Sequence, residues 1–176
     1  MIFGAKKMEY ESHSAQAIKE QLKYVESDKT KDYIEKRLLD QIKYYGESSK
    51  KSKLYYQILM LASIVIGALI PICTAFLNDK SFVKVLIAIL GAAVTAINAI
   101  LSMQNYRDLW VTHRGVRQDL EHTLYFYFNN VDEFSKKGTQ EEKDARLIEI
   151  CESILDEEKK KWIFSQKKSD QADNEK

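Results

Sequence analysis

Residues that break regular structure are scarce in this chain. The sequence holds one proline, Pro71, and six glycines among its 176 residues. Because proline and glycine punctuate turns and interrupt helices, a chain with so few of them is expected to be almost entirely helical. The sequence therefore predicts an all-α fold, organised as a single domain over residues 1–176.

Neither an excess of charge nor paired cysteines is present. The 27 Lys and Arg residues are balanced by 26 Asp and Glu residues, whereas proteins that bind nucleic acids generally need a basic excess. Cys73 and Cys151 lie far apart in the sequence and form no C-x-x-C pattern. We therefore expect no nucleic-acid partner, no metal site and no disulfide.

Catalytic signatures are also missing. His13, His113 and His122 are the only histidines, and no H-E-x-x-H, phosphate-binding or nucleophile-elbow pattern occurs. The acidic residues at 141–144 and 156–158 resemble solvated helix faces. We expect neither an enzyme nor a bound cofactor.

The chain does contain two long apolar runs without a charge. Residues 54–77 form a run of 24 residues, and residues 85–103 a run of 19. A helix needs about 20 apolar residues to cross the hydrocarbon core of a bilayer. Since the polar break at 78–84 is too short for a domain, the runs predict a two-transmembrane helical hairpin. The alternative is the buried hairpin of a soluble bundle, but such helices seldom run so long without a charge.

Amphipathic segments flank the two runs. Residues 1–53 carry apolar side chains at helical spacing, and a capped break is expected at Ser27 or Asp28. Residues 104–134 keep a three- and four-residue stripe, which predicts that the second membrane helix continues into the cytosol without interruption.

A third polar segment follows residue 134. Thr139 and Glu142 have the spacing of a capping box, which predicts a helix over residues 139–164 and a polar tail at 165–176. This helix should pack with the other two polar segments as a cytosolic bundle. Its expected core positions are Leu147, Cys151, Ile154, Leu155 and Trp162.

A stripe of small and polar residues marks each apolar run. The second run carries Ala88, Gly91, Thr95, Asn98 and Ser102 on one face, and the first carries Ser63, Gly67 and Thr74, with Pro71 expected to kink it. Small residues let membrane helices approach closely, so the stripe suits packing within one hairpin. The other interpretation is a pore lining in an oligomer. Asn98 decides between them, because an amide near mid-bilayer needs a partner or water.

Polar residues next to the second run form another candidate site. Arg107, Arg114 and Glu121 are seven residues apart and share one helix face, with Trp110 among them. One interpretation is a face toward water or lipid headgroups. The other is an ion-pair network with the helix that carries Arg37 and Gln41, because the planar guanidinium suits fixed pairs.

These residues resemble a known family. The stretch from Tyr33 to Tyr45, which includes Arg37 and Gln41, precedes a span containing Pro71; Arg107-Asp-Leu-Trp110, Arg114 and Leu120-Glu121 follow the second span. The pattern is similar to the SLATT domain, a bacterial two-transmembrane effector domain associated with SMODS and SLOG proteins and related to proteins that carry only a domain-of-unknown-function name. Two positions depart from it, since Tyr44 replaces a usual tryptophan and His113 a usual tyrosine.

The resemblance implies a pore-forming membrane effector of bacterial conflict and anti-phage defence systems, placed in the inner membrane. It implies a homo-oligomer in the lipid bilayer, triggered by a separate sensor or nucleotide-producing protein. The alternative function is a membrane anchor or scaffold that forms no pore and recruits a partner through its cytosolic bundle.

The orientation of the hairpin can be tested directly. Nine basic residues flank the runs on the side of the termini, whereas the loop offers only Lys80 and Lys84, so the positive-inside rule predicts cytoplasmic termini. A thiol reagent that cannot cross membranes should label Ser81→Cys in intact cells and leave Ser169→Cys unlabelled. Labelling of the second variant would reverse the topology. The flanking residues counted are Lys36, Arg37, Lys43, Lys50, Lys51, Lys53, Arg107, Arg114 and Arg117.

Overall fold

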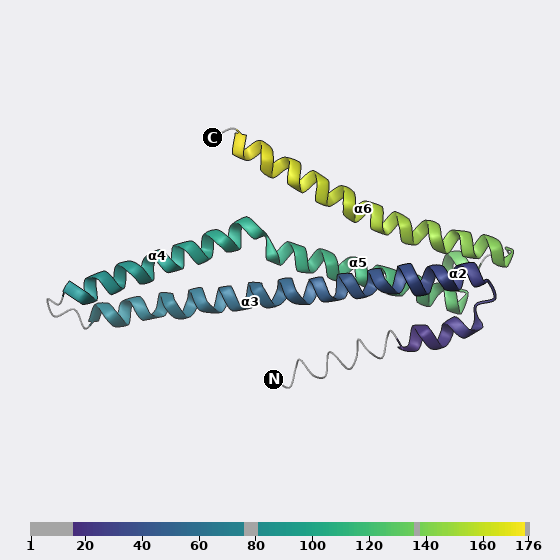
Figure 1. Ribbon diagram of the computed structural model, residues 1–176, viewed down its shortest axis with the longest axis horizontal. Coiled ribbons are helices and arrows are strands. Elements are labelled where there is room, and N and C mark those ends of the chain that lie inside the picture. Colours follow the sequence, from purple (N-terminus) through teal and green to yellow (C-terminus); the bar gives the residue numbers. More distant parts are fainter. Residues whose placement is uncertain (1–15, 76–80, 136–137, 175–176) are drawn as a thin grey trace. The chain divides into compact units, whose positions relative to one another are not determined.

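A computed structural model describes residues 16–75, 81–135 and 138–174 (Figure 1). These residues are helical apart from short connections, and none of them forms a strand, which confirms the all-α prediction. The chain divides into two compact units: Met1–Gly46 with Arg114–Lys176, and Glu47–His113. Of the loop expected at residues 78–84, residues 78–80 lie outside the described part of the chain, whereas residues 81–84 belong to a helix that begins at Ser81, so the loop prediction is wrong there.

The N-terminal part of the first unit is a series of helical segments. Residues 16–21 are helical and lead into η1 (Leu22–Tyr24), which is followed by α2 (Asp28–Asp32), the π-helix η2 (Tyr33–Leu38) and α3 (Leu39–Ala75). Ser27 has an extended backbone, and its hydroxyl accepts a hydrogen bond from the Thr30 amide at 3.4 Å. The break and cap predicted near Ser27 are confirmed, because this side chain satisfies an amide that the helix leaves unpaired.

The C-terminal part of the first unit contains the end of α5 (Tyr106–Asn129), η3 (Asp132–Phe134) and α6 (Gln140–Asn174). The capping box is confirmed: the Thr139 amide donates to the Glu142 carboxylate at 3.0 Å, and the Glu142 amide donates to the Thr139 hydroxyl at 3.2 Å. The backbone of α6 remains helical to Asn174 and so extends past the predicted end at residue 164.

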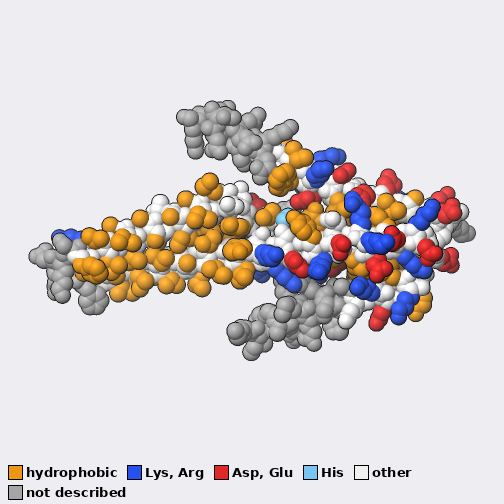
Figure 2. All heavy atoms as spheres, in the orientation of Figure 1, with side chains coloured by type: hydrophobic (Ala, Val, Ile, Leu, Met, Phe, Trp, Pro, Cys, Tyr) orange, Lys and Arg blue, Asp and Glu red, His pale blue; other side chains and the backbone are white. Residues whose placement is uncertain are grey.

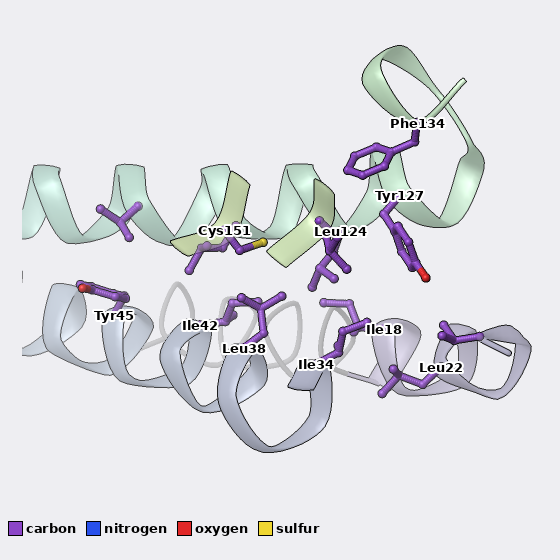
Figure 3. Close-up of a cluster of buried hydrophobic side chains, with 14 residues drawn as sticks. Ile18, Leu22, Ile34, Leu38, Ile42, Tyr45, Leu124, Tyr127, Phe134 and Cys151 are labelled. Atoms are coloured by element: carbon purple, nitrogen blue, oxygen red, sulfur yellow. The ribbon is translucent and has the colours of Figure 1, made fainter. Parts of the chain in front are cut away.

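The core of the first unit joins the N-terminal helices to α5 and α6 (Figure 3). The largest side chains with 0% exposure come from every one of these elements and follow the predicted apolar stripes: Ile18, Ile34, Leu38, Leu120, Leu124, Leu147 and Cys151. Burial raises the pKa of the Cys151 thiol to about 12. Trp162 was expected in this core but is 54% exposed, because α6 continues beyond the buried residues.

Asp144 places a carboxylate inside this core, where only 7% of the residue is exposed. It accepts hydrogen bonds from the hydroxyls of Thr30 at 2.7 Å and Tyr127 at 2.6 Å, and from the amide of Gln140 at 2.8 Å. The prediction that residues 141–144 form a solvated face is therefore wrong at Asp144. Spacing alone could not reveal these donors, because Thr30 and Tyr127 come from other segments.

Two further carboxylates of α6 contact the N-terminal helices. Glu152 accepts hydrogen bonds from Arg37 at 2.6 and 2.7 Å and from Tyr33 at 2.9 Å, and Glu158 accepts one from Tyr45 at 3.1 Å. The guanidinium of Arg37 is the main cause that holds the pKa of Glu152 below its ordinary value. Because the pKa is lowered on folding, this contact stabilises the fold above pH 4.5 and is lost as the pH falls through the folded value.

The long helix predicted from the second apolar run into the polar segment is interrupted. Helix α4 (Ser81–Gln104) ends one residue before Asn105, whose φ is 42°, and α5 begins at Tyr106. Asparagine tolerates this left-handed conformation better than most residues. Its carbonyl then accepts hydrogen bonds from the amides of Asp108 at 3.0 Å and Leu109 at 3.1 Å, which starts the new helix. The predicted uninterrupted helix is therefore wrong.

The Asp144 contacts predict a large effect on stability. Replacing Asp144 with alanine leaves the buried hydroxyls of Thr30 and Tyr127 without their acceptor, and should lower the free energy of unfolding by roughly 2–4 kcal/mol. Asp156→Ala, at an exposed position on the same helix, should change it by less than about 0.5 kcal/mol. Denaturant titration of the full chain in detergent, followed by circular dichroism, compares the two variants. Equal losses would contradict the role of Asp144.

Candidate functional site

The second unit contains two long apolar helical segments, residues 47–75 of α3 and all of α4, which lie side by side (Figure 1). Figure 2 shows that hydrophobic side chains cover the visible surface of these segments. Both are long and apolar enough to cross a membrane, and their most apolar 18-residue windows contain no buried residue. The core helix of a soluble protein would be buried over such a window. The two helices are thus compatible with membrane insertion.

Half-buried side chains on α4 mark the face that packs within the hairpin. They recur at three- and four-residue spacing, as expected for one face of a helix in contact with a neighbour. These positions are Val83, Leu86, Ile87, Leu90, Gly91, Ala93, Val94, Ile97 and Leu101. Most of them are large and apolar, so such side chains provide most of the contact, and Gly91 and Ala93 lie among them.

The polar stripe of α4 lies beside this packing face. Ala88, Thr95, Asn98 and Ser102 are exposed, and only Gly91 is half-buried. On α3, Ser63 and Gly67 are half-buried and Thr74 is exposed; α3 continues as a helix through Pro71. Most of the stripe on α4 is therefore available to another molecule.

Hydrogen bonds account for part of the polarity of the stripe. The hydroxyl of Thr95 donates to the Gly91 carbonyl at 3.0 Å, and that of Thr74 donates to the Pro71 carbonyl at 2.7 Å. Asn98 accepts a hydrogen bond from Ser63 across the hairpin at 3.4 Å. Within the described residues, the amide nitrogen of Asn98 has no acceptor. Its two N–H groups and the hydroxyl of Ser102 are the unused donors of the stripe among these residues.

The glycines of the two helices are not required by packing within the hairpin. A Cβ atom built on Gly67 or Gly91 would meet no atom within 4 Å. Glycine in a helix interior destabilises the helix by roughly 1 kcal/mol relative to alanine. A close approach between α3 and α4 therefore does not explain either glycine, whereas a close approach by a second molecule would.

Aromatic and basic side chains lie together at one end of the apolar segments. Lys53 lies 5.4 Å from the centre of the Trp110 ring, and the Ser49 hydroxyl donates to the Trp110 carbonyl at 3.0 Å. The rings of Tyr55 and Tyr106 lie 6.0 Å apart. Such amphipathic rings are typical of a membrane–water interface.

The other residues of the predicted network belong to separate contacts. Arg37 binds Glu152, whereas Glu121 binds Arg117 at 2.8 Å, and the two side chains of that second pair are only 14% and 17% exposed. Arg107 and Arg114 are exposed, and Gln41 is half-buried.

Sequence reasoning missed Arg117, although its position four residues before Glu121 is the usual spacing of a helical ion pair. Its guanidinium also covers Gly46, where a Cβ atom would lie 3.1 Å from Nη1. As for metals, no group of three potential ligands from His, Cys, Asp and Glu occurs within the residues that the structure describes.

One of the comparisons with known proteins found a match, and it covers both apolar helices. A family model described as "Protein of unknown function (DUF4231)" matches residues 40–142, or 103 of the 176 residues. The chain belongs to the DUF4231 family. The DUF4231 match includes both apolar helices and all of α5, but it does not name the SLATT domain, so that resemblance stays a prediction. No curated protein and no solved structure matches the chain.

Replacing Arg114 or Arg117 of α5 with alanine should have different effects on stability. Arg117→Ala removes the guanidinium that pairs with the mostly buried carboxylate of Glu121 and should lower the free energy of unfolding by about 1–3 kcal/mol. Arg114→Ala removes an exposed side chain and should change it by less than about 0.5 kcal/mol. Melting curves of the two variants in the same detergent compare these losses of stability. A larger loss for Arg114→Ala would show that the ion pair of Arg117 is not the important one.

Proposed function

We propose that this DUF4231 protein is a membrane effector whose hairpins assemble into a pore. The observation that carries the proposal is the exposed stripe Ala88, Thr95, Asn98 and Ser102 on a helix whose other exposed side chains are nearly all apolar. Lipid suits the apolar faces but leaves the amide nitrogen of Asn98 without an acceptor, which is costly in hydrocarbon. The stripe therefore favours contact with water or with another copy of the chain.

A pore requires several copies, because one hairpin cannot enclose water. In a ring of hairpins, the stripe would face the axis, and the open space at Gly67 would accept a neighbouring helix. Ring formation would leave the exposed apolar side chains of α3 and α4 toward lipid. The polar stripe would then contact water, and the apolar faces of α3 and α4 would contact lipid.

The cellular setting follows from charge and from family resemblance. The basic bias of the flanking segments supports insertion in a bacterial inner membrane with both termini in the cytoplasm. The resemblance to the SLATT domain supports a role in anti-phage defence, with membrane permeabilisation as the outcome. The trigger would be a separate sensor or nucleotide-producing protein acting on the cytoplasmic bundle.

A membrane anchor or scaffold without a pore is the second candidate. The Ser63–Asn98 hydrogen bond favours it, because this contact satisfies part of the amide within a single hairpin. The hydroxyls of Thr74 and Thr95 are likewise bonded within their own helices and need no water. In that case the cytosolic bundle alone would act, by binding a partner.

Replacing Asn98 with leucine distinguishes the two functions. In a pore, leucine should dry the constriction and abolish leakage of a dye from vesicles that hold the purified protein and its activator. In a scaffold, the same change should alter stability by about 1 kcal/mol or less, with no effect on the bilayer. Ala96→Leu is the matched control, because Ala96 is also exposed but lies on another face of α4.

The pore is supported when Ala96→Leu leaks like the parent protein and Asn98→Leu does not, at equal insertion. Leakage that survives Asn98→Leu would refute the lining role of the stripe. If the parent protein causes no leakage under any trigger, the scaffold is the better account.

A further inference from the structure

The outer part of α6 presents an aromatic and basic surface with no role in the core. Glu158 accepts a hydrogen bond from Tyr45 of α3, and α6 continues beyond it to Asn174. Directly after Glu158 come three exposed lysines at 159–161. Trp162, Ile163 and Phe164 follow and are 54%, 39% and 73% exposed. Figure 2 shows an apolar patch beside basic side chains at this part of α6.

The contacts within the first unit give the direction of this segment. Asp144, Glu152 and Glu158 bind Thr30, Arg37 and Tyr45 in that order, so α6 runs parallel to the N-terminal helices and to the start of α3. Tyr45 is followed nine residues later by Leu54, where the first apolar run begins, and Glu158 is followed six residues later by Phe164.

Charge supports contact with a negatively charged surface. Residues 159–168 contain five lysines and no acidic residue; of these lysines, Lys161 also forms an exposed ion pair with Glu157 of the acidic residues 156–158, at 3.7 Å. Lysines near an anionic membrane strengthen binding, and tryptophan and phenylalanine prefer the headgroup region.

We propose that residues 159–164 of α6 dock on the anionic surface of the bilayer that the hairpin spans. This inference rests on the proposed membrane insertion. The aromatic rings enter the headgroup layer, and the lysines pair with lipid phosphates. The cytosolic bundle is thereby attached to the membrane at a second place, independent of the two apolar helices.

The arrangement of the apolar residues favours lipid over a protein groove. Successive residues of a helix are about 100° apart, so Trp162, Ile163 and Phe164 together cover more than half of the circumference. A groove on a protein binds one face of a helix, through side chains that are three and four residues apart. A fluid headgroup layer can accept side chains from several faces at once.

The two tryptophans of the chain, Trp110 and Trp162, allow a direct test. Trp110→Phe leaves Trp162 as the sole tryptophan of the full-length protein. After reconstitution into vesicles of phosphatidylcholine and phosphatidylglycerol, its emission should shift to shorter wavelength, and brominated acyl chains should quench it. Both effects should weaken in vesicles of phosphatidylcholine alone.

Charge is tested in the same Trp110→Phe background. Replacing Lys159, Lys160 and Lys161 with glutamine should weaken docking by about fivefold per lysine at low ionic strength. The matched control replaces three exposed lysines of the N-terminal helices, Lys19, Lys23 and Lys29, with glutamine. It removes the same charge from the protein and should leave the quenching of Trp162 unchanged.

The converse variant, Trp162→Phe, reports on the hairpin through Trp110. Quenching of Trp110 without quenching of Trp162 would overturn the docking of α6 and leave the membrane insertion intact. If neither Trp110 nor Trp162 is quenched, both the docking of α6 and the membrane insertion of the hairpin are overturned. A blue shift of Trp162 that bromine does not quench, and that grows with protein density in the vesicle, would show that a second copy covers the segment, which also overturns lipid docking.

Discussion

The carboxylate of Asp144 is buried among neutral groups, and it is stable there only while the hydroxyls of Thr30 and Tyr127 and the amide of Gln140 donate to it. Because these donors belong to α2, α5 and the first turn of α6, the contact sets how α6 lies against the other helices of the unit. The weaker, more exposed contacts of Glu152 and Glu158 then continue along the same line. Core side chains such as Leu147 and Cys151 lie between these carboxylates along α6 and fill the interior.

The apolar hairpin depends on contacts between uncharged side chains and not on a buried carboxylate. Its helices carry no charge over the two runs, and in the described residues they contact one another through aliphatic and small side chains and through the hydrogen bond from Ser63 to Asn98. Water is an unfavourable solvent for so much exposed apolar surface. The same pair of helices is well suited to lipid, where the backbone is satisfied within each helix and, among the described residues of the stripe, Asn98 and Ser102 retain unused donors.

Much of the fold could be predicted from the sequence because it depends on local signals. The scarcity of proline and glycine predicts the helical class, and the spacing of apolar residues predicts the faces that form the core. The caps at Ser27 and Thr139 are predictable because each is a hydrogen bond between residues three apart. Asp144 was missed because two of its donors are distant in sequence, and the exposure of Trp162 because periodicity does not show where a neighbouring helix ends. The break at Asn105 was missed because a single residue of left-handed backbone leaves no mark on the apolar pattern. The candidate stripe was visible as a pattern, but its position beside the packing face required the structure.

The interruption at Asn105 has a mechanical consequence. An uninterrupted helix behaves as a stiff shaft, in which a tilt or rotation at one end appears at the other. Where one hydrogen-bonded ladder stops at Gln104 and the next begins at Tyr106, bending is concentrated at a single joint and torque is poorly transmitted through it. Helix α4 can then tilt without twisting α5, so the two segments can respond to different surroundings although they are consecutive in the chain.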